Sequence, residues 1–230
     1  MAVFYRGDCL GLIKNLPDKS INLIYFNPPF ATTENDWDTP LNWPELFKEF
    51  FRVLKPNGMI AIHCAIPFNY TLIRASCRDP SYSWYWDKMN NTCPMIARKQ
   101  PLRQVEEILV WKNKQTTYYP DAIRVGTEQR TFTSRGTSSY YGATTIQEKQ
   151  TVVGRYQTHL IEMKAERRGF STRPESLIEL ILKAYTVPGD TVLDPTCYHG
   201  ICGKVAKRLG RKWIGFDKKF YPTKLLCNSN

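Results

Sequence analysis

The sequence lacks the features of a membrane-spanning, secreted or disulfide-bonded protein. Its strongly apolar stretches, such as residues 59–66, are far shorter than the roughly 20 residues that a membrane helix needs. The first eight residues hold no apolar core of secretory length. The seven cysteines are an odd number with no regular spacing, which is typical of reduced thiols in a reducing compartment. We therefore expect a cytoplasmic protein that does not associate with membranes.

Low-complexity segments, internal repeats and metal-site spacing are also missing. Hydrophobic residues make up 42% of the chain and charged residues 23%, which excludes a disordered or collagen-like protein. The segment 197–202 contains two cysteines and one histidine, but no second pair of ligands accompanies it, so we predict no metal. With 230 residues, the chain suits one domain that carries a sizeable insertion.

Positive charge, by contrast, is in excess. The formal net charge is +11 and the isoelectric point is near 9.3. Residues 98–168 hold thirteen basic and seven acidic side chains, a larger positive balance than their length would predict. Two interpretations stay open: a surface that faces nucleic-acid phosphates, or a generally basic, solvated surface.

Short β-type runs alternate with helical patterns, which indicates a mostly parallel sheet covered on both faces. The predicted strands are residues 3–5, 21–26, 59–63, 83–86, 108–111, 191–194 and 213–216. The predicted helices are residues 44–54, 67–77, 174–184 and 203–209. From residue 112 to about 168 the periodicity fails, and we interpret this stretch as a functional insertion or a partly disordered segment.

The tetrapeptide Asn27-Pro28-Pro29-Phe30 directly follows the predicted strand 21–26. In open α/β sheets the ligand crevice lies beyond the carboxyl ends of the strands, so this is where chemistry is expected. The two prolines stiffen the backbone and leave the Asn27 side-chain oxygen and the Pro28 carbonyl as fixed acceptors beside an aromatic ring. Such a set suits a flat heterocycle with an exocyclic amine, because two acceptors would hold its hydrogens and stabilise the charge that develops on attack. A rigid turn without chemistry is the alternative.

Near the carboxyl end, a strand ending at Asp194 leads into a loop with Gly200 and Gly203, then a helix and a strand closing at Asp217. This is the layout of a dinucleotide-binding unit, with the acid placed for ribose hydroxyls. The phosphate-binding Gly-x-Gly-x-x-Gly is absent. A nucleoside cofactor without a pyrophosphate needs fewer backbone amides, which favours S-adenosylmethionine over NAD. An ordinary strand–helix–strand unit remains the alternative.

Together with Gly7-Asp8-Cys9-Leu10, residues 52–58, 86–88, 101–110, 171–174 and 188–195, these motifs resemble the S-adenosylmethionine-dependent amino-group DNA methyltransferases in the permuted beta-class order. The resemblance implies a Rossmann-like methyltransferase sandwich with a mostly parallel seven-stranded sheet and helices on both faces. It also implies a catalytic half in residues 1–112, an inserted target-recognition region in 113–168 and a cofactor-binding half in 169–230.

The resemblance also assigns residues by position. Asn27, Pro28, Pro29 and Phe30 match the catalytic tetrapeptide. The positions that match the family's cofactor pocket are Asp8, Cys9, Ser171, Thr172, Arg173, Asp194, Thr196, Gly200 and Asp217. Relatives usually have Phe, Gly and Ser where this chain has Thr196, Tyr198 and His199, a departure that could narrow the pocket or abolish cofactor binding.

The implied reaction is methyl transfer to adenine N6 in duplex DNA by base flipping. Cytosine N4, RNA, protein glutamine and a catalytically weak DNA-binding subunit stay open as alternatives, as does a homodimer. The predicted DNA-contacting residues are six arginines interleaved with tyrosines in the insertion: Arg124, Arg130, Arg135, Arg155, Arg167 and Arg168. His63 closes an apolar strand and is predicted to be structural.

Overall fold

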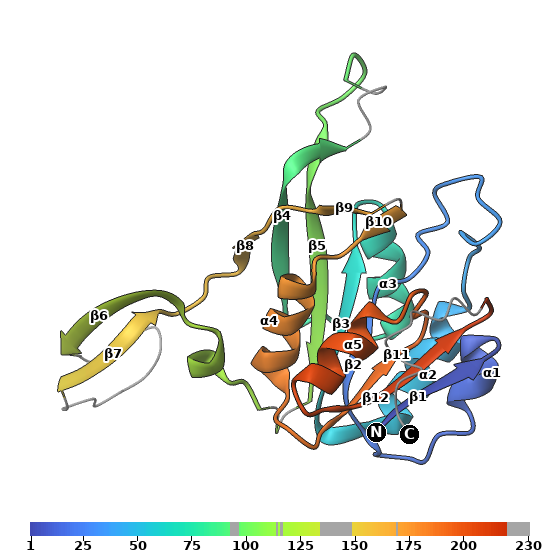
Figure 1. Ribbon diagram of the computed structural model, residues 1–230. Helices are drawn as coiled ribbons and strands as arrows, with labels where there is room; N and C mark the ends of the chain where they lie inside the picture. Colours follow the sequence, from blue (N-terminus) through green and yellow to red (C-terminus); the bar gives the residue numbers. More distant parts are fainter. Residues whose placement is uncertain (93–96, 114, 116, 134–148, 169, 220–230) are drawn as a thin grey trace.

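Eight strands hydrogen-bond into one central sheet in the computed structural model of the protein (Figure 1). The structure describes residues 1–92, 97–113, 115, 117–133, 149–168 and 170–219. The strand order is β1-β12-β11-β2-β3-β5-β4-β8. These strands are β1 (Ala2–Arg6), β2 (Ile21–Phe26), β3 (Leu54–Cys64), β4 (Tyr82–Thr92), β5 (Arg103–Lys112), β8 (Leu160–Glu162), β11 (Thr191–Asp194) and β12 (Lys212–Asp217).

The first five strands in this order run parallel to their neighbours, while β5 is antiparallel to both β3 and β4. The predicted α/β class and all seven predicted strands are confirmed. The predicted strand count was one too low, because β8 also joins the sheet, in parallel with β4. Only Ile161 of its three residues is buried, so β8 carries little apolar pattern in the sequence.

Helices cover both faces of the sheet, as predicted. They are α1 (Cys9–Ile13), α2 (Trp43–Val53), α3 (Phe68–Ser76), α4 (Glu175–Tyr185) and α5 (Ile201–Arg208). One apolar core contains side chains of α1, α2 and α3, and the other contains those of α4 and α5. Because side chains alternate along a strand, Tyr25 of β2 joins the second core, whereas Ile24 and Phe26 join the first. The strand that leads to Asn27 is therefore buried on both faces.

The segment 113–168 leaves the sheet after β5. It first forms a short 3₁₀ helix, η2 (Pro120–Ile123), whose Ile123 is buried, and the Tyr119 amide donates to the Ala184 carbonyl at the end of α4. A hairpin of β6 (Val125–Thr133) and β7 (Lys149–Arg155) then projects from the rest of the molecule (Figure 1). The chain returns through β8. The three-part division at residues 112 and 168 stays a prediction.

Candidate active site

The sites predicted from sequence meet at one edge of the sheet. Strands β1, β2, β3, β11 and β12 all end there, and we call it the carboxyl edge. Arg6 pairs with Asp217, Asp194 with Gly215, and Phe26 with Ile62. Asp8, Asn27, Asp194 and Asp217 therefore lie on adjacent strand ends although up to 209 positions separate them in the chain.

Asn27 presents an acceptor without a partner. Its Oδ1 atom is buried and has no hydrogen bond within the described part of the chain. Its own carbonyl accepts a hydrogen bond from the Thr196 hydroxyl at 3.1 Å, which ties the end of β2 to the loop after β11. Buried polar atoms nearly always have partners, so an orphaned oxygen at a strand end indicates a donor supplied by a ligand.

The residues after Asn27 are held in place from two sides. Pro28 is buried, and the Phe30 ring stacks on Phe68 of α3, with the ring centroids 4.9 Å apart and the planes at 24°. The following loop is pinned by Asp38, a buried carboxylate that accepts the amides of Ala31, Thr32 and Thr33 and the Thr33 hydroxyl at 2.7–2.9 Å. Burial would raise the pKa of Asp38, but these four donors outweigh it and lower the pKa. The tetrapeptide is thus preorganised.

At the other side of the carboxyl edge, two acids are fixed by backbone amides. The Asp217 carboxylate accepts the Tyr198 amide at 2.8 Å and the Lys219 amide at 2.9 Å. Asp8 caps α1 by accepting the Leu10 and Gly11 amides. A carboxylate can accept about four hydrogen bonds, so Asp217 keeps capacity for ligand hydroxyls. Cys9, the first residue of α1, is buried, and burial raises the pKa of its thiol to about 11.

Asp194 is buried at the end of β11. Burial raises its pKa to about 8; the Thr196 amide opposes this rise, and the negative charge of Asp217 adds to it. At neutral pH the folded protein therefore holds a protonated carboxyl group at the carboxyl edge. A positively charged ligand placed beside it would favour the ionised form.

The loop 196–200 accounts for one departure from the family pattern. Tyr198 has a left-handed backbone conformation (φ 47°), as does Gly200 (φ 69°). A glycine, which relatives usually have at position 198, adopts this conformation without strain. The loop nevertheless forms, because the Tyr198 amide reaches Asp217 and the Tyr198 ring packs on His199 with centroids 3.7 Å apart. The loop backbone at Tyr198 is therefore held by contacts at both its amide and its ring.

A buried polar chain, which sequence reasoning missed, connects the predicted cofactor segment to the catalytic strand. Arg173 donates to Glu106 Oε1 (2.6 Å from Nη2), and the same oxygen lies 2.7 Å from His63 Nδ1. His63 Nε2 lies 2.8 Å from the Tyr25 hydroxyl. His63 is fully buried and has a partner at each ring nitrogen, as expected of a structural histidine. The signal that could have found the chain is the acidic pair at 106–107, which precedes an apolar strand run.

The charges along this series of hydrogen-bonded side chains are complementary. Burial would raise the pKa of Glu106, but Arg173 and the hydrogen bond from His63 lower it to about 2. Burial lowers the pKa of His63 more than Glu106 raises it, so the imidazole is neutral. It therefore donates from Nδ1 and accepts the Tyr25 hydroxyl at Nε2. Arg173 is fixed as one end of a rigid chain rather than as a mobile surface group.

The other predicted residues are distributed unevenly. Ser171 and Thr172 belong to β10 (Phe170–Thr172), which pairs with β9 (Glu166–Arg168). Arg167 and Arg168 lie in β9. The side chains of Ser171, Thr172, Arg167 and Arg168 are outside the described part. So are Arg135 and the side chain of Arg130. Arg124 and Arg155 lie at the base of the β6–β7 hairpin.

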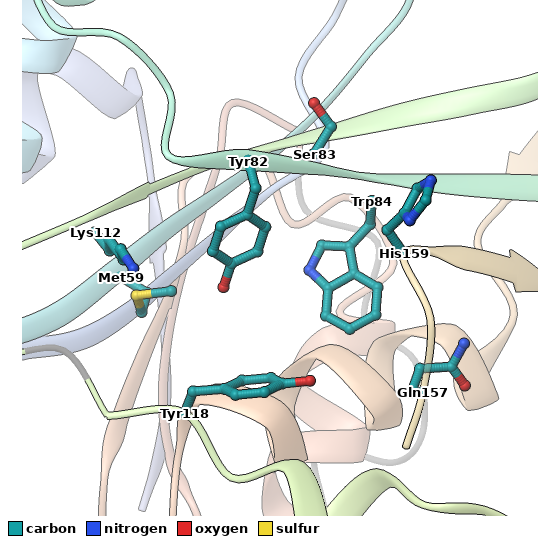
Figure 2. A pocket seen from close by; sticks show the side chains of 8 residues that line it. All are labelled: Met59, Tyr82, Ser83, Trp84, Lys112, Tyr118, Gln157 and His159. Carbon is teal, nitrogen blue, oxygen red and sulfur yellow. The ribbon is translucent and has the colours of Figure 1, made fainter. Parts of the chain in front are cut away.

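A cavity lies away from the carboxyl edge, where the insertion joins the sheet. This cavity of about 450 Å³ is bounded mainly by aromatic and polar side chains (Figure 2). They are Met59, Tyr82, Ser83, Trp84, Lys112, Tyr118, Gln157 and His159. Met59 pairs with Lys112, five residues before β3 reaches the carboxyl edge. The cavity therefore lies where the chain leaves the sheet toward the β6–β7 hairpin and returns from it.

Within the described ranges, no group of three or more His, Cys, Asp and Glu side chains is arranged to hold a metal ion. None of the helices in those ranges has the length and apolar character required to cross a bilayer.

The fold is an α/β domain in which parallel strands end beside an Asn-Pro-Pro-Phe tetrapeptide with a buried, unpartnered acceptor. The family model of the DNA methylases (N6_N4_Mtase) matches residues 21–222, so the chain belongs to this family. The type II methyltransferase M.BamHI of Bacillus amyloliquefaciens is 27% identical over an alignment of 228 positions, which covers 93% of this chain and 53% of the relative. The chain thus spans about half the length of that relative.

Solved structures show the same fold. The PvuII DNA methyltransferase (cytosine-N4-specific) matches with a TM-score of 0.65 and 18% identity, covering 95% of this chain and 82% of the other. The M1.HpyAVI–SAM complex matches with 0.61 and 20%, covering 95% and 94%. A DNA modification methylase of Thermus thermophilus, TTHA0409, in complex with S-adenosyl-L-methionine matches with 0.58 and 17%, covering 93% and 88%. The family and these complexes indicate S-adenosylmethionine as the cofactor.

Proposed function

We propose that the protein methylates the exocyclic amine of a base in duplex DNA. The orphaned Asn27 Oδ1 at the carboxyl edge carries this proposal. An exocyclic amine is a poor nucleophile because its lone pair is delocalised into the ring. Asn27 Oδ1 and the Pro28 carbonyl would accept its two hydrogens, which draws the nitrogen toward tetrahedral geometry and stabilises the developing positive charge.

The target amine lies inside the base stack, so the base must be extruded into the site. Phe30, braced by Phe68, offers a fixed ring on which a flipped base stacks. S-adenosylmethionine supplies the electrophilic methyl group. The protein would contribute position, with Asn27 and Pro28 holding the amine and Phe30 holding the base. The amine becomes acidic once methylated, so it can release its proton to water without a dedicated base.

The cofactor would bind at the carboxyl ends of the adjacent strands β1, β12 and β11. We assign Asp217 to the ribose hydroxyls, Asp8 and Cys9 to the adenine, and Asp194 with Thr196 and Gly200 to the methionine part. Ser171, Thr172 and Arg173 would close the carboxylate end. The free hydrogen-bonding capacity of Asp217 and the fixed loop backbone around Tyr198 support this placement.

We propose adenine N6 as the target. Extruding adenine breaks a pair with two hydrogen bonds rather than three, so flipping costs less. Cytosine N4 is the second candidate, because Asn27 can hold either amine and the PvuII neighbour is described as cytosine-N4-specific. We further propose a cytoplasmic location, where DNA and the cofactor are both available, and leave a homodimer as an open partner.

Methyl transfer from labelled S-adenosylmethionine to unmethylated duplex DNA tests this proposal. Mass analysis of the digested nucleosides separates N6-methyladenine from N4-methylcytosine. Asn27→Ala should abolish turnover while cofactor and DNA binding persist. The control Asn15→Ala changes an exposed asparagine and should leave turnover unaltered. Turnover by Asn27→Ala at the wild-type rate would remove the catalytic assignment. Unmodified DNA after incubation with the wild type, despite cofactor binding, would favour the weak DNA-binding subunit.

A further inference from the structure

Strands β4 and β5 continue past the carboxyl edge as a two-stranded ribbon (Figure 1). The last pair between β3 and β5 joins Cys64 to Glu107, whereas β5 begins at Arg103, four residues earlier. At about 3.3 Å per residue, the ribbon reaches roughly 13 Å beyond the end of β3. We call residues 88–92 and 97–105 the arm.

The arm stands beside the catalytic tetrapeptide. Asn27 follows β2, β2 pairs with β3, and β3 pairs with β5. Neighbouring strands are about 4.8 Å apart, so the base of the arm lies roughly 10 Å to the side of Asn27. A two-stranded β-ribbon fits the major groove of B-DNA, which is about 12 Å wide. The arm is therefore placed to contact a duplex whose base enters the site at Asn27.

The charge of the arm is of one sign. Residues 88–105 of the sequence contain four basic side chains (Lys88, Arg98, Lys99 and Arg103) and no acid. Arg98, Lys99 and Arg103 are exposed. Lys164, also exposed, lies alongside, because the amides of Met163 and Ala165 donate to the carbonyls of Asp87 and Lys88. Such a surface is complementary to DNA phosphates.

The base of the arm is rigid. Asp87 pairs with Val105 and Thr92 with Arg103, so β4 carries extra residues in a bulge between these pairs. The Asp87 carboxylate accepts the Met89 amide at 2.7 Å and the Gln104 amide group at 2.9 and 3.0 Å. Bulges of this kind redirect strands next to active sites. The direction of the arm is therefore set by the fold.

The β6–β7 hairpin is less well placed for the same task. It departs after Lys112, which pairs with Met59, five residues or roughly 17 Å back from Cys64. Arg124 at its base is used within the chain: it bonds Asp121 and lies over the Tyr156 ring at 4.1 Å. Figure 1 shows the hairpin projecting away from the arm.

We propose that the arm makes the phosphate contacts that flank the target base in duplex DNA. The inference rests on the proposed function and moves the main contact surface from the β6–β7 hairpin, with its Arg124 and Arg155, to the β4–β5 ribbon and Lys164.

The test compares DNA affinities by fluorescence anisotropy with a labelled duplex at several salt concentrations. The double variant Arg98→Ala/Lys99→Ala should bind about tenfold more weakly at low salt. Its salt slope, log K against log salt, should fall by about one for each lost phosphate contact. The matched double variant Lys14→Ala/Lys48→Ala removes two exposed charges, one directly after α1 and one in α2, and should bind like the wild type. Arg155→Ala should also bind the duplex with wild-type affinity.

Circular dichroism and S-adenosylmethionine titration confirm that each variant is folded. Wild-type affinity and salt slope in the arm variant would overturn this inference alone and leave the proposed function standing. A larger loss in Arg155→Ala than in the arm variant would also overturn it, in favour of the hairpin. A wild-type protein that binds cofactor but not duplex DNA would overturn the proposed function together with the inference.

Discussion

Replacing Asp194 by Asn should change how the stability of the protein depends on pH. Burial raises the pKa of Asp194 to about 8 in the folded chain, whereas an aspartate in an unfolded chain has a pKa of about 3.9. Between these values the folded protein keeps a proton that the unfolded chain has lost. Wild-type stability therefore falls as pH rises, by about 1.4 kcal/mol per pH unit from this group, until the folded pKa is passed.

Asp194→Asn keeps the shape and the acceptor for the Thr196 amide but has no proton to lose. Relative to the wild type, the variant should gain about 2–3 kcal/mol of unfolding free energy between pH 5 and pH 7. Urea unfolding followed by circular dichroism at pH 5, 6, 7 and 8 measures this difference. Asp36→Asn makes the same chemical change at an exposed position and controls for it.

Parallel pH profiles for the wild type and Asp194→Asn would refute the reasoning, because they would mean that the carboxyl group is ionised in the folded protein. The same group offers a second readout. The proposed cofactor carries a sulfonium charge, so its binding at pH 7 should release a proton from Asp194. Calorimetric titration in two buffers with different ionisation enthalpies detects that proton, and the variant should not release it.

Three further changes have outcomes fixed by the structure. Gly203→Ala should destabilise the protein by about 1–3 kcal/mol in urea unfolding, since the new Cβ would lie 2.7 Å from the buried Trp213 ring. Gly11→Ala is the matched control, because Gly11 is also helical but faces open space, and it should stabilise the protein by up to about 1 kcal/mol. Glu106→Gln should cost about 3 kcal/mol at neutral pH, because it removes the negative charge that faces the largely buried Arg173 guanidinium. The folded pKa of Glu106 is about 2, whereas a glutamate in an unfolded chain has a pKa of about 4.3. This cost should therefore shrink as the pH falls from about 5 toward 2, because the unfolded wild-type chain takes up a proton there that the folded protein does not bind. Tyr198→Gly should raise the free energy of unfolding by roughly 0.5–1 kcal/mol, because glycine adopts the left-handed backbone without strain. A lower melting temperature of the variant would show that the contacts of the tyrosine ring outweigh this strain.

Local pattern was sufficient to predict most of the central sheet. The all-apolar run before Asn27 and the helical spacing of Leu46, Phe47 and Phe50 are properties of adjacent residues, and burial enforces them directly. The place of Asn27 followed as well, because parallel strands end at one edge and a ligand binds there. The strand–helix–strand layout alone was sufficient to predict that Asp194 and Asp217 lie at the same edge.

Only the tertiary structure decided what depends on pairing between distant segments. The hydrogen-bonded chain from Tyr25 through His63 and Glu106 to Arg173 joins three strands and one loop, and no local spacing connects position 25 to position 173. The length of the β4–β5 ribbon depends on where β3 stops, and β8 pairs by three backbone partners with little apolar pattern of its own. Periodicity specifies which face of an element is buried, whereas register and strand ends are set by partners far away in the sequence.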